Sequence, residues 1–293
     1  MKKAILLLSV AFALILSTGC NRNNQTKEIT RIYIAHAIDE STENTGAANE
    51  WFRNELEKYL GIEVVQMTDV DHVIAIEAMR GGHLDIMFAS AVATVRTQDV
   101  VDIEIVGRLN HSEVNPLTSL FITNNDEIQS IEDLEGRSFA FVSPSSSSGF
   151  FFPAFYLIQN LGLDGNLITH PGYFFSTTAF SGSHETTASG VGFGDFDAGA
   201  VLSTVFRGLV DSGVVNQADF RIIAETPPSP DSNYIMRADL PEDLKNKIRS
   251  FFLNLDSRQY FEDAWGFPDL RYLPGDYGVL DDIRFMQEVL GME

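Results

Sequence analysis

The chain alternates between short apolar stretches and segments whose apolar residues recur at helical spacing. In residues 49–60, apolar side chains at positions 51, 52, 56, 59 and 60 lie on one helical face, and Gly61 ends the pattern. The same reasoning predicts strands over residues 29–35, 62–67, 84–88, 101–108, 117–123, 138–142, 198–201, 220–225 and 234–237. It predicts helices over residues 49–60, 70–79, 130–134, 150–161, 204–210, 241–255 and 281–290, with Ser130 as the N-cap of the third.

This alternation is typical of an α/β protein with helices on both faces of its sheets. A chain of 293 residues is near the size at which a single core stops growing, so two such sheets account for its length. Ligands of α/β proteins bind where the carboxyl ends of strands meet. We therefore expect the functional site in a cleft between the two sheets.

The first residues have the pattern of a bacterial export signal. Met1, Lys2 and Lys3 are followed by a thirteen-residue apolar run over 4–16, which is too short to span a bilayer. Residues 16–20 read LSTGC, and small residues before a cysteine resemble a lipobox. We predict a signal peptide over residues 1–19 and lipidation of Cys20. The alternative is an ordinary signal peptide with a chance cysteine.

The polar residues after Cys20 indicate a tether over residues 20–28, which would hold the protein outside the cytoplasm at a bacterial membrane. Cys20 is the only cysteine, so no intramolecular disulfide can form. The formal net charge is −21 and becomes −23 without residues 1–19, because Lys2 and Lys3 are lost. So acidic a chain is not expected to bind nucleic acid or to adsorb directly to anionic lipid.

A run of serines lies between a predicted strand and a predicted helix. Residues 143–149 read SPSSSSG, and free backbone N–H groups point out of a helix start. The helix dipole, the serine hydroxyls and a glycine that permits close approach suit a tetrahedral oxyanion without any Lys or Arg. The alternative is a flexible surface loop with a serine N-cap.

Several motifs occur together around the serine run. Residues 131–141 read IEDLEGRSFAF, and Ser146, Ser147, Ser148, Gly149 and Pro153 fit the pattern S-[ST]-S-G-x-x-x-P. These segments resemble the phosphate/phosphite/phosphonate-binding proteins of ABC importers, in which a "sL-dL-G" helix and a strand precede that serine pattern. Residues 182–186 resemble that family's G-H-[DE] element with one extra residue. Residues 195–200, 85–88 and 276–277 resemble three further family segments. The resemblance covers about residues 29–291.

The resemblance implies a two-lobed periplasmic-binding-protein fold of type II, with a hinge and an interlobe cleft. We assign residues 29–116 and 231–293 to lobe 1, and residues 117–230, which include the serine-rich anion loop, to lobe 2. The resemblance places Ser146, Ser147, Ser148 and His184 at the ligand. It also implies a monomer that delivers its ligand to the permease subunits of an ABC transporter.

Three positions on the expected cleft wall depart from the family pattern. His72 stands where a Tyr often begins the first-lobe helix, and Ala89-Ser90 follows Phe88 where an aromatic residue or Gly is common. Residues 202–204 read LST where many members carry an acid. The organic substituent of the ligand therefore stays open. We retain His72 and Ser90 as candidate ligand contacts.

Two further residues are candidate cleft contacts by position. His36 follows the first strand, and Tyr234 follows the proline-rich link over residues 227–230.

We expect a solute-binding lipoprotein that binds a small phosphorus oxyanion and carries out no catalysis. No cofactor or metal is expected, because the chain lacks paired histidines at metal-binding spacing. The alternatives are the same fold binding another small anion or a heterocycle, a ligand-sensing lipoprotein, and a secreted esterase using Ser147 and His184. A G-x-S-x-G elbow, which would favour the esterase, is missing from the sequence.

Overall fold

The computed structural model describes residues 29–36, 45–68, 70 and 72–291. The predicted signal peptide, the tether and Cys20 lie outside these residues. The described residues from Arg31 onwards belong to one compact unit. In the part of the chain that the structure describes, no helix combines the length and apolar character needed to cross a membrane.

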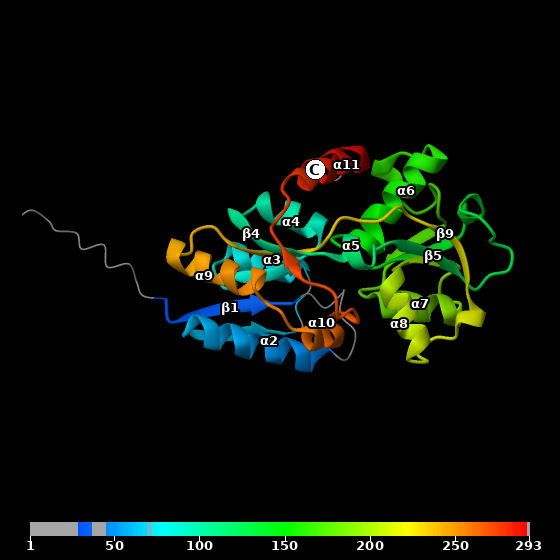
Figure 1. Cartoon of the computed structure of the whole chain (residues 1–293). Coiled ribbons are helices and arrows are strands. Elements are labelled where there is room, and N and C mark those ends of the chain that lie inside the picture. The colour runs from blue at the N-terminus through cyan, green and yellow to red at the C-terminus, as the bar shows by residue number, and fades with distance from the viewer. Residues whose placement is uncertain (1–28, 37–44, 69, 71, 292–293) are drawn as a thin grey trace, which may run out of the picture. The chain divides into compact units, whose positions relative to one another are not determined.

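The described strands form two sheets, as the alternating pattern predicts (Figure 1). The six-stranded sheet has the order β11 (Tyr272–Leu273), β4 (Ile103–Leu109), β10 (Asn233–Arg237), β3 (Ile86–Ala89), β1 (Arg31–Ala35), β2 (Glu63–Met67). The five-stranded sheet has the order β7 (Thr177–Phe180), β6 (Ser138–Phe141), β8 (Ala198–Leu202), β5 (Ser119–Thr123), β9 (Arg221–Glu225). Both are mixed, since β1 pairs in parallel with β2 and β3 while β10 runs antiparallel to β3 and β4.

The helices follow the predicted ones closely, with four additions. They are α2 (Thr45–Leu60), α3 (His72–Arg80), α4 (Ala91–Gln98), α5 (His111–Val114), α6 (Phe152–Leu161), α7 (His184–Phe193), α8 (Ser203–Asp211), α9 (Glu242–Leu253), α10 (Arg258–Trp265) and α11 (Gly278–Leu290). Short turns η2 (Glu132–Leu134), η3 (Ser147–Phe151), η4 (Gly165–Leu167) and η5 (Gln217–Asp219) connect them. The sequence predicted none of the helices α4, α5, α7 and α10, and it missed the strands β7 and β11.

The predicted N-cap at Ser130 is wrong. Residues 132–134 form a single 3₁₀ turn, and Ile131 is the residue before it. The backbone N–H of Ser130 donates to the Asp133 carboxylate at 3.0 Å, and its hydroxyl lies 3.3 Å from the same oxygen. The Asp133 carboxylate therefore accepts the hydrogen bonds that close this turn, and Ser130 donates them.

The chain passes between the two sheets through residues 110–118 and 226–232. These two segments run side by side, because the N–H of Ser229 donates to the Leu117 carbonyl at 2.7 Å and that of Thr226 to the Ser119 carbonyl at 2.9 Å. The strands before 110 and after 232 belong to the six-stranded sheet, and those between belong to the other. The lobe boundaries at 116/117 and 230/231 fall inside these segments and stay a prediction.

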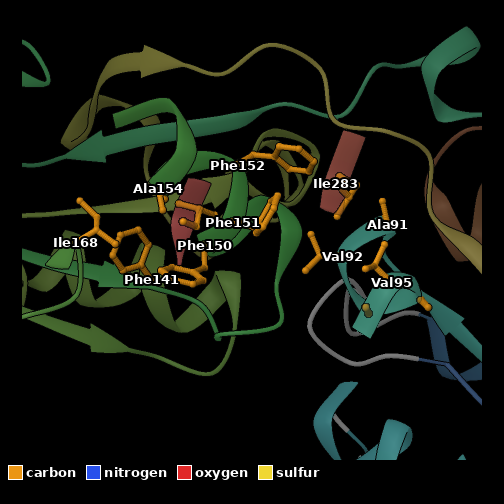
Figure 2. Packing of buried hydrophobic residues seen from close by; sticks show 14 of the residues in the cluster. Ala91, Val92, Val95, Phe141, Phe150, Phe151, Phe152, Ala154, Ile168 and Ile283 are labelled. Atoms are coloured by element: carbon orange, nitrogen blue, oxygen red, sulfur yellow. The ribbon is translucent and has the colours of Figure 1, made fainter. Parts of the chain in front are cut away.

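A continuous hydrophobic core lies behind the serine run. Phe150, Phe151 and Phe152 are all buried there. Figure 2 shows them between Phe141, on the strand β6, and residues of α4 and α11. The serines are therefore presented by a turn whose own side chains are fixed by aromatic packing.

The C-terminal helix α11 contacts elements attached to both sheets. Arg284 donates to Asp99, just after α4, at 2.7 Å. At the other end of α11, a Cβ added at Gly165 of η4 would lie 2.5 Å from the Val289 carbonyl oxygen, so the two backbones are in close contact. The sequence placed all of 231–293 with the first lobe, whereas α11 also packs on the second.

Candidate functional site

The serine run forms a buried turn between β6 and α6. Ser146 is its N-cap, with φ −73° and ψ 125°, and its hydroxyl oxygen accepts the Gly149 N–H at 3.0 Å. The first turn is π-helical, since the Phe151 N–H donates to the Ser146 carbonyl at 3.0 Å. Ser147 and Ser148 stand at the first positions of this turn, where helices leave backbone N–H groups without carbonyl partners. The predicted anion-binding loop is thus a structured helix start.

Gly149 is required here by space. A Cβ at this position would lie 2.3 Å from both Cβ and Cγ2 of Val142, the residue after β6. The Val142 N–H also donates to the Gly149 carbonyl at 3.0 Å. The turn therefore folds directly onto the end of its own strand, and only glycine permits that approach.

His184 joins the serine turn from a third element. It is the first residue of α7, after the N-cap Ser183, and it is buried. Its Nδ1 accepts the Leu202 backbone N–H at 3.1 Å, and its Nε2 lies 3.3 Å from the Ser148 hydroxyl oxygen. A nitrogen that accepts an N–H cannot carry a proton, so in the neutral ring the proton is on Nε2. His184 therefore presents an N–H donor beside Ser148.

The start of α4 faces the serine turn from the other sheet. Ser90 follows β3 and caps α4, because its hydroxyl accepts the Ala93 N–H at 3.2 Å. The Val92 N–H, in the first turn of α4, donates to the Ser147 hydroxyl at 3.3 Å. Two helix starts therefore meet, and both direct the positive ends of their dipoles at the same place.

The sequence identified Ser90 but missed Val92 and the helix itself. Residues 91–98 read AVATVRTQ, in which half of the positions are β-branched and lower the helix propensity. The available signal was Ser90 directly after a buried strand, which is the usual position of an N-cap.

The electrostatics of this site come from neutral donors. Among the described residues, Lys245 is the only Lys or Arg with a buried side chain, and it pairs with Glu104 and Glu242 on the six-stranded sheet's side. The serine hydroxyls, the helix-start N–H groups and Nε2–H of His184 remain as donors. This set suits an anion with several acceptor oxygens.

The structure places His36 and Tyr234 together, within an aromatic cluster. Nδ1 of His36 hydrogen-bonds the Tyr234 hydroxyl, and both rings pack on Phe52. Burial lowers the pKa of His36 to about 4 and raises that of Tyr234 well above its usual value. Tyr234 also packs edge-on against Phe88, with ring centroids 5.2 Å apart. No contact joins this pair to the serine turn among the described residues, and its ligand role stays a prediction.

The two remaining wall positions are also buried. His72 is fully buried at the first position of α3, so it is not a surface cap. Ser203 lies in the segment where many members of the family carry an acid. It is buried at the start of α8, and its hydroxyl accepts the Thr118 N–H at 3.4 Å. Ser203 therefore fixes α8 to a crossing segment of the chain.

The arrangement lacks the polarity of a hydrolytic triad. In such a triad Nδ1–H donates to a carboxylate and Nε2 accepts the serine proton. In His184, Nδ1 is an acceptor and Nε2 carries the proton, and its serine neighbour is Ser148 rather than Ser147. In the described part of the chain, no group of three or more His, Cys, Asp or Glu side chains is placed to hold a metal ion.

Comparison with solved structures identifies the fold as that of type II periplasmic binding proteins. PhnD1 from Prochlorococcus marinus (MIT 9301), solved in complex with methylphosphonate, matches with a TM-score of 0.78 and 21% identity, covering 90% of this chain and 99% of that chain. The predicted α/β fold of this type is confirmed.

Sequence comparison then gives the family. A probable ABC transporter phosphite binding protein, PhnD1 of Prochlorococcus marinus (strain MIT 9301), is 29% identical over 71% of each chain. The phosphate-import protein PhnD of Mycolicibacterium smegmatis is 22% identical over 97% of this chain and 95% of its own. The sequence model of the periplasmic substrate-binding proteins of phosphonate ABC transporters matches residues 34–285, and the chain belongs to that family.

Proposed function

We propose that this protein captures a small phosphorus oxyanion, namely a phosphonate, phosphite or phosphate, where the starts of η3 and α4 meet. It then delivers the anion to the permease of an ABC importer. In this proposal Ser146, Ser147, Ser148 and His184 bind from one lobe, and Ser90 and Val92 complete the site from the other.

The contact between Ser147 and Val92 carries the proposal. The Ser147 hydroxyl accepts the Val92 N–H at 3.3 Å and keeps its own proton free to donate. An oxyanion seated between the two helix starts would replace this hydrogen bond and accept from both the Val92 N–H and the Ser147 hydroxyl, together with Nε2–H of His184. Donors from two sheets then hold one ligand, which favours closure of the lobes around it.

The relatives support the choice of phosphorus. One relative is a probable phosphite binding protein, another is a phosphate-import protein, and PhnD1 was solved in complex with methylphosphonate. The acidity of the chain does not oppose this, since charges beyond about 8 Å are largely screened at physiological salt.

A ligand screen tests the proposal. Thermal shift and calorimetry with phosphite, phosphate, methylphosphonate and 2-aminoethylphosphonate should identify a ligand, and one present at 100 times its Kd adds roughly 2.7 kcal/mol to the free energy of unfolding. A response to an amino acid, sugar or heterocycle alone would refute the phosphorus assignment.

The substitution Ser147→Ala tests the site itself. It should weaken binding by about 1–3 kcal/mol, because a hydrogen bond to a charged group is lost. Ser130→Ala, in an exposed turn of the same lobe, is the matched control and should leave affinity unchanged. Equal affinities for both variants would remove Ser147 from the site.

We also propose that Cys20 carries the lipid that holds the protein at the membrane, after cleavage of residues 1–19. The support is the LSTGC sequence directly after the apolar run of the export signal. Cells labelled with a radioactive fatty acid should label the protein, and Cys20→Ala should abolish labelling. Labelling of the Cys20→Ala variant would contradict this part of the proposal.

A further inference from the structure

A cavity of about 420 Å³ lies between elements of the two sheets. This volume is within the range of small-molecule pockets, roughly 300–1,000 Å³. Phe88 at the end of β3 and Trp265 at the end of α10 line it from the six-stranded sheet, and Leu202 and Val205 line it from the start of α8. Leu117, on a crossing segment, lines it as well. We call this cavity the chamber.

The chamber adjoins the proposed anion site on two sides. Leu202, in its wall, donates its backbone N–H to Nδ1 of His184 at 3.1 Å, and Nε2 of the same ring reaches the serine turn. On the other side, Phe88 is two residues before Ser90, the N-cap of α4. The chamber is therefore connected to the proposed anion site through Leu202 and Phe88, and it offers space for the remaining atoms of a ligand anchored at the serines.

The inner wall of the chamber is apolar and aromatic. The side chains of Phe88, Leu202, Val205 and Leu117 are all buried in the protein and also line the cavity. The Trp265 ring packs against Phe88, with centroids 4.9 Å apart and planes tilted by 42°. Such a wall gains free energy by covering apolar or aromatic ligand atoms.

None of the described residues that line the chamber offers a buried charge to pair with an ammonium group. The only carboxylate among these lining residues, that of Asp211, belongs to an exposed residue, one helical turn from the exposed Arg207. The remaining ionisable wall residue is His111, which is buried against Trp265 and Phe267. Burial lowers the pKa of His111 to about 4, so its ring is neutral at pH 7. An amine in the chamber would lose its hydration without gaining a partner.

We infer that the ligand is a phosphorus oxyanion with a bulky, uncharged, apolar or aromatic substituent, which the chamber between Phe88, Trp265 and Leu202 encloses. This inference rests on the proposed function, because the chamber selects the substituent only when the oxyanion is anchored at the serine turn. Phosphite, phosphate and aminoalkylphosphonates should therefore bind this chain more weakly than such a ligand.

Calorimetry on the full chain with four probes tests the inference. Phenylphosphonate should bind at least about tenfold more tightly than methylphosphonate, since each buried CH₂-sized group contributes roughly 0.8 kcal/mol. Phosphite and 2-aminoethylphosphonate should bind more weakly than phenylphosphonate. Thr204→Trp fills the chamber from α8 and should bring the phenyl-to-methyl affinity ratio towards one. Lys247→Trp, which adds the same ring to an exposed position of α9, should keep the wild-type ratio.

The outcomes separate this inference from the proposed function. If methylphosphonate or phosphite binds while phenylphosphonate binds no more tightly, the inference fails and the proposed function stands. Tightest binding of 2-aminoethylphosphonate also overturns the inference. If no phosphorus compound binds, the proposed function fails and the inference with it. If Thr204→Trp does not fold, the affinity order of the wild-type protein decides alone.

Discussion

The two hydrogen bonds of His184 can be removed one at a time. Asn places its amide oxygen near the position of Nδ1, so His184→Asn keeps an acceptor for the Leu202 N–H and loses the donor at Nε2. Gln places its amide nitrogen near the position of Nε2, so His184→Gln keeps that donor and loses the acceptor. One variant therefore tests ligand binding, and the other tests the fold.

The magnitudes follow from the partners. His184→Asn should weaken binding of methylphosphonate or phosphite by about 1.5–3 kcal/mol, the range for hydrogen bonds to charged groups, and should leave the free energy of unfolding almost unchanged. His184→Gln leaves the buried Leu202 N–H, now bonded at 3.1 Å, without an acceptor. That loss should lower the free energy of unfolding by about 1–3 kcal/mol, with a smaller loss of affinity.

Calorimetry gives the affinity, and urea denaturation without ligand gives the free energy of unfolding. His184→Asn should show the larger loss of affinity, and His184→Gln should show the larger loss of unfolding free energy. If His184→Asn binds normally and only loses stability, His184 is a structural residue and the tautomer argument is wrong.

Two predictions concern the fold. Gly149→Ala should lower the free energy of unfolding by about 1–3 kcal/mol or more, because its Cβ would lie 2.3 Å from the Val142 side chain. The control Gly46→Ala, with nothing within 4 Å of the added Cβ, should not lower it. Equal melting temperatures of the two variants by circular dichroism would contradict this prediction. Burial lowers the pKa of His111 from 6.5 to about 4, so the unfolded chain takes up this proton first as pH falls. The stability present above pH 6.5 is then lost towards pH 4, by up to about 3 kcal/mol for this ring, and His111→Gln should reduce the loss of unfolding free energy between pH 7 and pH 5.

The sequence predicted the two-sheet α/β fold, because periodicity is local and each element carries its own pattern. It also placed the serine run correctly between a strand and a helix. The site's second half was hidden for a local reason, since the β-branched residues of α4 do not look helical. It was also hidden for a non-local one, because the Val92–Ser147 contact joins residues 55 positions apart.

His36 and Tyr234 are candidates that the sequence selects without revealing what surrounds them. The sequence suggests His36 because it follows the first strand and Tyr234 because it follows the proline-rich link, and both lie in an aromatic cluster with Phe52. Whether a ring after a strand faces a cleft or a core depends on the helices that cover it. Here α2 and α9 supply Phe52 and Phe252, which pack on Tyr234 from segments far away in sequence. The chamber was beyond sequence analysis for the same reason.

The helix α11 gives the molecule a third link between its sheets, in addition to the two crossing segments. It is joined to the segment after α4 through Arg284 and contacts η4 at Gly165. If the lobes open, as the proposed function expects, α11 must bend or one of its ends must detach. The free energy of that change would then be part of the affinity for any ligand that closes the cleft. A substitution at Ile283, on the packed face of α11, should therefore change Kd from a position outside the proposed anion site.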